Sequence, residues 1–368
     1  MAGLELSFHG GQQISITGEQ LSPALQYGPS DGDPRLLPQL LAWHREKDGI
    51  GLPQDGIVVL NGAQEGLFIA GYLFLDAGDS VVVSEPTYPG ALSAFSPFTD
   101  RFLPIALDKD GLCTADLEER LRQLREADEP LPKLIYTIPS GHNPGGVSLS
   151  PDRRRDLLRL ASEYDLLVLE DDPYQLVRLD DAPPPETLQS LDRDGRVIRL
   201  DSFSKIFAPG LRVGYASGDP QIMHHFLLYK QSANLHTSSL TQHILAAYLE
   251  DTTPAGFRAA IKENCRLYRE NRDEMVAAAR ELLPAAVRFN VPQEGLFIWF
   301  ELPQSCDAAS MVAEHSRALK ILLVPGSAFS SSGGCHHCMR ASFSMVDRTD
   351  IRDGMQRFAE MIRRAEEG

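Results

Sequence analysis

The sequence predicts an α/β protein: a large domain with a mostly parallel sheet sandwiched by helices, followed by a smaller α+β domain. From about residue 57 to 217, short runs that are apolar on both faces alternate with helical patterns, which suits a sheet covered on both sides. Near Pro254 the pattern changes to one long helical stretch followed by mixed strands and helices. We therefore expect an N-terminal segment over 1–30, a large domain over 31–253 and a small domain over 254–368. The N-terminal segment is expected to pack with the small domain or with a dimer partner.

Five short apolar runs are the expected strands of the large sheet. They cover residues 57–60, 80–83, 134–137, 166–169 and 197–200. A helix is expected to begin at Pro151, because Ser150 is a good N-cap and proline suits the first helical position. In the small domain we expect a helix from about Pro254 to near Pro284 and strands over 297–300 and 321–324.

Composition and charge exclude several classes of protein. The chain has 368 residues, 43% of them apolar, and its net charge of -16 argues against a nucleic-acid partner. Its apolar runs are too short to cross a bilayer, and no secretory or transit signal is evident at the start. We expect a cytoplasmic protein without a membrane partner, or a mitochondrial matrix protein if the natural N-terminus is longer.

The cysteines indicate a reducing compartment, because there is an odd and sparse set of five in a long chain. They are Cys113, Cys265, Cys306, Cys335 and Cys338. The run from Cys335 to Cys338, Cys-His-His-Cys, has the residue types of a metal site. Four consecutive residues do not converge tetrahedrally and no second pair accompanies them, so we expect no metal there. The preceding residues 330–334 are expected to form a flexible loop.

Polar motifs follow the expected strands at their carboxyl ends, where open α/β sheets gather functional residues. The first motif, residues 61–67, would present free backbone N–H groups that favour a phosphate, although such glycine turns are more often only turns. The second carries Tyr88, which either stacks on a flat cofactor or packs under its loop. The third carries Asn143, which either donates to an oxygen anion on a cofactor ring or starts a turn.

The fourth motif is the acidic run from Glu170 to Asp172, followed by Tyr174. Carboxylates after a buried strand need a cation nearby, either a protonated pyridine nitrogen or a divalent metal. No second acidic cluster of comparable quality supports the metal. Tyr174 lies close enough in sequence to reach the same ring.

The fifth motif, residues 201–205, ends in Lys205, with Arg212 seven residues later. A lysine beside hydroxyl groups and an arginine is what covalent attachment of a phosphorylated aldehyde requires, because the lysine forms a Schiff base and the others hold the phosphate. Taken alone, such a lysine is usually only a surface lysine after a strand, and the other motifs favour the cofactor role. Arg340 is the best candidate for a bidentate clamp on a substrate carboxylate, its alternative being a surface arginine.

Together these motifs resemble the fold-type I pyridoxal-phosphate enzymes of the class I/II aminotransferase family, and within it the kynurenine/2-aminoadipate aminotransferase group. The stretches that carry the resemblance are residues 25–30, 136–144, 170–174, 201–205, 291–299 and 323–329. They occur in the family's order across nearly the whole chain.

The resemblance implies a role for each residue. Lys205 would carry pyridoxal 5'-phosphate and move the proton, with Asp171 on the pyridine nitrogen and Tyr88 stacked on the ring. Asn143 and Tyr174 would bind the phenolic oxygen, and Arg340, with Asn143, the substrate. The phosphate would be held by Ala63, Gln64, Ser202, Ser204 and Arg212. Tyr27 would reach the phosphate of a neighbouring subunit, which implies a homodimer with shared active sites.

Two stretches depart from the family pattern. The family turn Asn-Pro-Thr-Gly reads Asn-Pro-Gly-Gly over 143–146, so we expect a more mobile loop there. The N-terminal arm and Gly-rich segment that close over the substrate are expected to be missing or reduced to residues 1–11, which affects substrate enclosure and specificity.

The implied activity is transamination of an amino acid, with 2-oxoglutarate as the acceptor. The donors implied are 2-aminoadipate, kynurenine or another aromatic or aliphatic amino acid. A β-eliminating lyase or cyclising synthase on the same fold is an alternative, as is a cofactor-binding homologue without turnover. A regulatory domain is disfavoured by the acidic charge.

Overall fold

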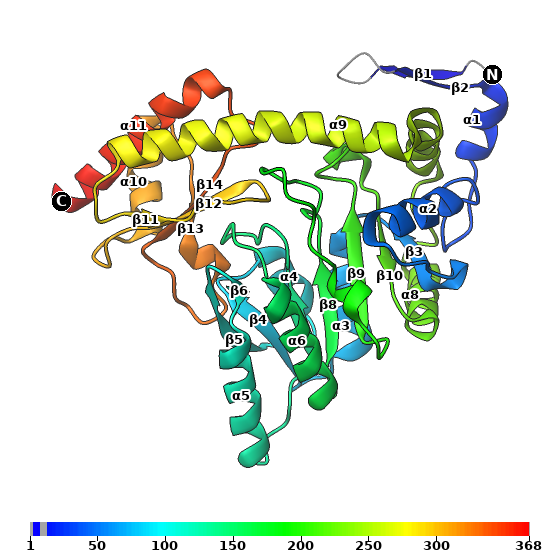
Figure 1. Cartoon of the computed structure of the whole chain (residues 1–368), viewed down its shortest axis with the longest axis horizontal. Helices are drawn as coiled ribbons and strands as arrows, with labels where there is room; N and C mark the ends of the chain where they lie inside the picture. The colour runs from blue at the N-terminus through cyan, green and yellow to red at the C-terminus, as the bar shows by residue number, and fades with distance from the viewer. Residues whose placement is uncertain (1–2, 8–12, 368) are drawn as a thin grey trace.

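The computed structural model describes residues 3–7 and 13–367, and its centre is an eight-stranded sheet (Figure 1). In spatial order the strands are β3 (Ile57–Leu60), β10 (Gly214–Ser217), β9 (Val197–Ser202), β8 (Leu167–Asp171), β7 (Leu134–Thr137), β4 (Ser80–Glu85), β5 (Arg101–Asp108) and β6 (Gly111–Leu112). Pairing is parallel from β9 through to β5, whereas β10 and the short β6 run antiparallel to their neighbours. The five predicted strands are confirmed, within two residues at their ends.

Three strands of this sheet were not predicted, namely β5, β6 and β10. β10 reads Gly-Tyr-Ala-Ser, which has no apolar run, so its place depends on pairing with β3 on one side and β9 on the other. β5 has only one fully buried position along its eight residues, so its pattern is not that of a buried strand. β6 is two residues long.

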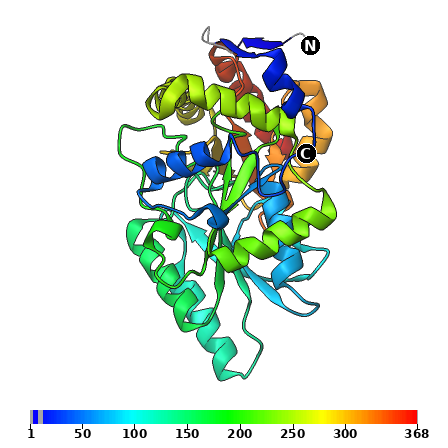
Figure 2. The same ribbon diagram turned by 90° about the vertical axis from the view of Figure 1, so that its right-hand side faces the viewer.

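Side chains alternate between the two faces of the sheet along each strand, and each face packs in its own hydrophobic cluster. Val82 and Ile135 pack on one face with helices α5 (Thr114–Glu126), α6 (Pro151–Glu163) and α7 (Leu188–Leu191). Val81, Val83 and Tyr136 pack on the other with α2 (Leu37–Asp48), α3 (Ala63–Phe74), α4 (Pro89–Phe95), α8 (Pro220–Ala233) and α9 (Ser239–Leu282). Helices therefore cover both sides of the sheet, as predicted (Figure 2). The Ser150 N-cap is also confirmed, since its Oγ accepts from the N–H of Arg153.

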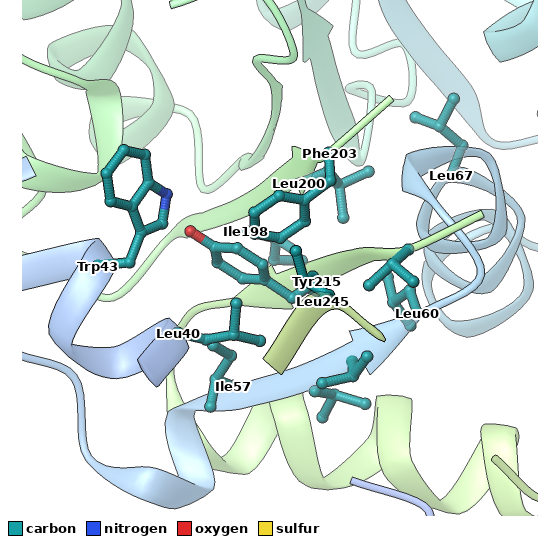
Figure 3. Packing of buried hydrophobic residues seen from close by; sticks show 14 of the residues in the cluster. Leu40, Trp43, Ile57, Leu60, Leu67, Ile198, Leu200, Phe203, Tyr215 and Leu245 are labelled. Carbon is teal, nitrogen blue, oxygen red and sulfur yellow. The ribbon is translucent and has the colours of Figure 1, made fainter. Parts of the chain in front are cut away.

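The segment that ends in Lys205 is anchored in the larger of these clusters. Leu200 and Phe203 lie buried beside Tyr215 of β10, with Leu40 and Trp43 of α2 close by (Figure 3). Phe203 N–H also donates to Val213 O. This packing holds the chain on either side of the Lys205 turn against rigid elements.

The second unit is built on an antiparallel sheet of β11 (Arg288–Phe289), β12 (Phe297–Glu301), β14 (Cys338–Ser342) and β13 (Val324–Pro325), with α10 (Ala308–Leu319) and α11 (Arg348–Glu367). The predicted strand over 321–324 is wrong except for Val324. Leu323 is buried in the small-unit core and Ile321 packs against it, but Leu322 is 79% exposed, and residues 321–323 pair with no strand. α9 contains a kink at Thr253, where φ is 61°, and continues to Leu282, close to the predicted end. The proposed boundary between 253 and 254 lies at this kink.

The N-terminal segment comprises β1 (Leu4–Ser7), β2 (Gln13–Ile16) and α1 (Gly18–Ala24), which lie beside the first half of α9 (Figure 1). Ile14 and Ile16 are buried in the cluster of the large unit. The predicted short arm over 1–11 falls partly outside the described residues. Among the helices that the structure describes, none combines the length and apolar character of a membrane span.

Candidate active site

A cavity of about 310 Å³ opens at the carboxyl ends of β4, β7, β8 and β9 and is closed on its far side by β12 and β14. All the predicted site residues except Tyr27 line it. These are Ala63, Gln64, Tyr88, Asn143, Asp171, Tyr174, Ser202, Ser204, Lys205, Arg212 and Arg340. Residues from loops spread over nearly 280 positions of the chain are thus brought together by the sheet.

One end of the cavity is rich in hydrogen-bond donors. α3 begins there at Ala63, so its first backbone N–H groups have no intrahelical partner. Arg212 Nη1 donates to Ser204 Oγ at 3.2 Å, and its Nη2 donates to Asn61 O at 3.2 Å. Gly62, at φ 84°, makes room for this guanidinium, since a Cβ there would lie 2.5 Å from Arg212 Nη2. A helix N-terminus, hydroxyls and an arginine form a suitable cradle for a phosphate.

Asp171 lies buried at the end of β8 with one oxygen free. Its Oδ2 accepts from the hydroxyl of Tyr136 at 3.0 Å, while its Oδ1 is buried and has no hydrogen-bond partner among the described residues. Burial raises the pKa of Asp171 from its ordinary 3.8 to about 7, and the Tyr136 hydrogen bond only partly offsets this. A cationic ring nitrogen in the cavity would satisfy the free oxygen and stabilise the carboxylate.

The neighbouring carboxylates point to the opposite face, where each lies close to Arg199. Its guanidinium lies 3.0 Å from Glu170 and 3.4 Å from Asp172, and all three side chains are fully buried. Glu170 also accepts from two backbone N–H groups at the start of α7. The predicted metal alternative for this acidic run has no support in the described residues, because a protein cation already faces two of its three carboxylates.

A second acidic cluster lies behind β9, where His44, Asp48 and Asp201 come close enough to share a metal ion. Lys47 Nζ lies 2.7 Å from Asp48 and 2.9 Å from Asp201, so a protein cation takes the central position. Burial lowers the pKa of His44 to about 4, which leaves its ring neutral. This cluster ties α2 to β9 and fixes the base of the Lys205 segment.

The small unit supplies the opposite wall of the cavity. Arg340 Nη1 donates to Asn143 Oδ1 at 2.7 Å, which leaves the Asn143 amide hydrogens free to donate. The guanidinium lies 4.2 Å from the ring centre of Phe297 and 4.9 Å from that of Phe329. Its Nε is buried and unpaired within the described part of the chain. These free donors suit a carboxylate.

Lys205 is half-buried between these two ends. Burial lowers the pKa of Lys205 below its ordinary 10.5, and the charges of Arg340 and Arg212 lower it further. Tyr88 lines the same cavity, with its hydroxyl 3.4 Å from Gln64 Oε1. A neutral amine fraction on Lys205 favours nucleophilic attack and proton transfer.

Tyr27 lies outside this cavity. It is 83% exposed, and its ring packs edge-on against His236 with centroids 5.8 Å apart. The sequence interpretation missed Phe297, Tyr136 and Arg199 as residues of the site or its support. A charged Arg199 in the middle of an apolar strand is itself a signal of buried ion pairing, since such a residue needs partners.

The cavity fits the predicted cofactor at both of its ends. The unpaired buried oxygen of Asp171 suits a protonated pyridine, and the Arg212 guanidinium, which fits against Gly62 only because glycine has no Cβ, suits a phosphate. Lys205 lines the same cavity as these two groups. Pyridoxal 5'-phosphate carries both groups on one ring, with an aldehyde for the lysine.

We expect Asp171→Asn to raise the free energy of unfolding of the cofactor-free protein above that of wild type by more at about pH 8 than at about pH 5. Because the pKa of Asp171 is raised in the folded state, its protonated form stabilises the fold at low pH, and this contribution is lost as the pH rises through about 7. Asparagine has no such loss, and the difference from wild type should be on the order of 3 kcal/mol by urea unfolding. The control is Asp165→Asn, at a carboxylate whose side chain is 92% exposed. A pH profile identical to wild type would exclude the raised pKa.

This chain is similar to aminotransferases over most of its length. The family model for aminotransferases of class I and II matches residues 17–358. Aromatic-amino-acid aminotransferase 1 of Thermococcus litoralis is 36% identical, over 95% of this chain and 82% of that protein. The solved kynurenine aminotransferase of Pyrococcus horikoshii is 38% identical with a TM-score of 0.88, over 94% of this chain and 83% of that chain. The α-aminoadipate aminotransferase of Thermus thermophilus, complexed with N-(5'-phosphopyridoxyl)-L-leucine, is 32% identical with a TM-score of 0.86, over 95% and 86%.

These matches confirm the predicted resemblance, the fold class and the cofactor. The matched stretch includes the whole large sheet and the small-unit strand that carries Arg340. The chain belongs to the class I and II aminotransferases and is a pyridoxal-phosphate-dependent enzyme.

Proposed function

We propose that this enzyme transfers the amino group of an aromatic amino acid, kynurenine or 2-aminoadipate to a 2-oxo acid, with 2-oxoglutarate as the acceptor. The observation that carries the proposal is the meeting of Lys205, Asp171 and Arg340 in one cavity. The names of the similar proteins support these donors. The apolar rings of Phe297 and Phe329 beside the carboxylate-binding arginine suit a long or aromatic side chain.

Each residue of the cavity has a separate role that follows from its position. When bound, pyridoxal phosphate supplies an aldehyde for amines and a ring that accepts the electrons left by a departing proton. Asp171 keeps a positive charge on the ring nitrogen. Arg340 holds the substrate carboxylate, and Lys205 Nζ, once displaced by the substrate amine, takes the proton from the substrate Cα. Because burial, and then the charges of Arg340 and Arg212, lower the pKa of Lys205, its amine loses a proton more readily than a solvated lysine does.

We also propose a homodimer in which Tyr27 binds the partner's phosphate. Tyr27 is largely exposed and stands outside its own cavity. α3, which begins at the phosphate cradle, carries the exposed rings of Phe68 and Tyr72, packed with Phe98 and Tyr229. An exposed aromatic patch of this kind favours a protein contact. A second copy on α3 would stand close to the cradle.

Replacing Lys205 tests the activity itself. Lys205→Ala should lower kcat by about 10³-fold or more, because it removes both the attachment point and the proton carrier. Borohydride reduction followed by peptide mass mapping should find the cofactor on Lys205 in wild type and on no lysine in the variant. Lys109→Ala, at an 85% exposed lysine, is the matched control. Retained transamination in Lys205→Ala would refute the proposal, and release of pyruvate and ammonia without any 2-oxo acid would assign a lyase instead.

Replacing Arg340 tests substrate binding. Arg340→Lys keeps the charge but loses the planar fork, so kcat/KM for the amino acid should fall about 10- to 100-fold. Most of the change should be in KM, measured with saturating 2-oxo acid. The absorbance of the bound cofactor should stay unchanged, since Arg340 is assigned to the substrate. A loss confined to kcat would contradict this assignment.

Replacing Tyr27 tests the shared active site. Tyr27→Phe removes only a hydroxyl, so the dimer should persist in sedimentation while the Kd for pyridoxal phosphate rises about tenfold. Tyr72→Phe, at another exposed tyrosine, should bind the cofactor as wild type does. Equal cofactor affinity in the Tyr27 variant and wild type would remove Tyr27 from the phosphate site.

A further inference from the structure

Cys335 and Cys338 stand at the two ends of a tight turn that leads into β14. The N–H of Cys338 donates to the carbonyl of Cys335 at 3.1 Å, which closes the turn. Residues at the ends of such a turn have Cα atoms within about 7 Å of each other. A disulfide needs Cα atoms about 4.4–6.8 Å apart, so the backbone already brings this pair into bonding range.

The two thiols are reduced and interact with each other. Both belong to a small apolar cluster with Trp299 and Phe329. Cys338 is buried and donates its S–H to Cys335, which lowers the pKa of Cys335 and raises that of Cys338. Cys335 is half-buried beside His336, whose side chain is 62% exposed. One accessible thiol inclined to ionise therefore stands beside one protected thiol.

The histidines of this motif are engaged elsewhere. The carbonyl of His336 accepts from Ala308 N–H at 2.8 Å, and that of His337 accepts from Leu302 N–H at 2.9 Å. The His337 ring lies 3.0 Å from the amide of Gln304. These contacts hold the middle of the turn against the small unit and leave the thiols as a pair.

The thiol pair is coupled to the arginine of the cavity. Cys338 and Arg340 are two residues apart on β14 and so lie on one face of the strand. Phe329 contacts both, since it packs in the cysteine cluster and lies 4.9 Å from the Arg340 guanidinium. At Gly326, in the same short helical turn as Phe329, a Cβ would lie 2.6 Å from Cys338 Cβ. A shift of the cysteine turn must therefore displace the Phe329 segment.

The loop before the pair is fastened to the large unit. Ser331 donates to Glu85 from its N–H at 3.0 Å and from its hydroxyl at 2.8 Å, and Ser330 also donates to that carboxylate. The loop predicted over 330–334 is present, and the half-buried Glu85 carboxylate holds its serines. Phe329 O accepts from Thr87 N–H at 2.8 Å, one residue before Tyr88. The cysteine turn thus follows directly after two contacts that close the cavity.

We propose that Cys335 and Cys338 form a redox-active dithiol that closes to a disulfide by exchange with small-molecule disulfides, and that closure weakens the hold of Arg340 on the substrate carboxylate. The Cys335 thiolate attacks one sulfur of the disulfide and expels one thiolate, giving a mixed disulfide. The Cys338 thiol then loses its proton to solvent, attacks Cys335 and expels the second thiolate. The two cysteines are oxidised and the small disulfide is reduced to two thiols. The effect on substrate rests on the proposed function.

The bond itself is tested on the cofactor-loaded enzyme in buffers of oxidised and reduced glutathione, quenched with an alkylating reagent and mapped by peptide mass. Excess oxidised glutathione should yield the Cys335–Cys338 disulfide, and dithiothreitol should reverse it. Cys335→Ser should leave Cys338 as an alkylated thiol. Cys113→Ser, at another half-buried cysteine, should close as wild type does. A stable glutathione adduct without closure, or protection of both thiols by one equivalent of zinc, would overturn the proposal.

The functional link is tested on the same samples. Oxidation of wild type should raise the KM for the amino acid about threefold or more with a smaller change in kcat, and dithiothreitol should restore it. Cys335→Ser should keep one KM across all glutathione ratios. Complete closure with an unchanged KM would refute the link to Arg340. If the enzyme forms the disulfide with oxidised glutathione but shows no transamination in its reduced form, the proposed function is refuted and the dithiol assignment stands.

Discussion

The arrangement of the site depends on the pairing of Arg199 with Glu170 and Asp172 on one face of the sheet. Buried carboxylates are unfavourable without a cation, and this guanidinium forms ion pairs with the two that flank Asp171. Because side chains alternate along a strand, Asp171 alone is left to face the cavity. Its Oδ1 therefore has no protein partner among the described residues, in a place where a cofactor nitrogen can supply one. Because the carboxylates on either side of Asp171 are paired with Arg199, Asp171 is the one left to pair with the cofactor nitrogen.

The second unit completes the cavity with Arg340 and with the loop before β14. Arg340 reaches Asn143 across the gap, and the loop before β14 is fastened to Glu85. Substrate binding is thus assigned to the strand that also carries Cys338. A change at this strand acts on the carboxylate end of the substrate and leaves the phosphate cradle, built wholly from the large unit, in place. Cofactor retention and substrate affinity can therefore vary separately.

Sequence reasoning succeeded where local pattern and chemistry agree. Continuous apolar runs marked β3, β7 and β9, and polar residues directly after such runs marked Asn143 and Lys205. It failed where a neighbour decides the outcome. β10 has no apolar run and is held by two flanking strands, whereas the apolar run over 321–323 packs on the small-unit core through Leu323 without pairing as a strand. Sequence patterns do not identify Glu85 as an anchor, since its serine partners lie about 245 positions away.

The order of elements, the family and the residues that carry the chemistry can be predicted from the sequence, because they follow from short-range patterns and from side-chain type. The partners of those residues are set by the tertiary structure. The division of the acidic run between Arg199 and the cavity, the contact of Arg340 with Asn143, and the exposure of Tyr27 all join segments far apart in the chain. Such pairings depend on the register of strands and the packing of units, which local patterns do not encode.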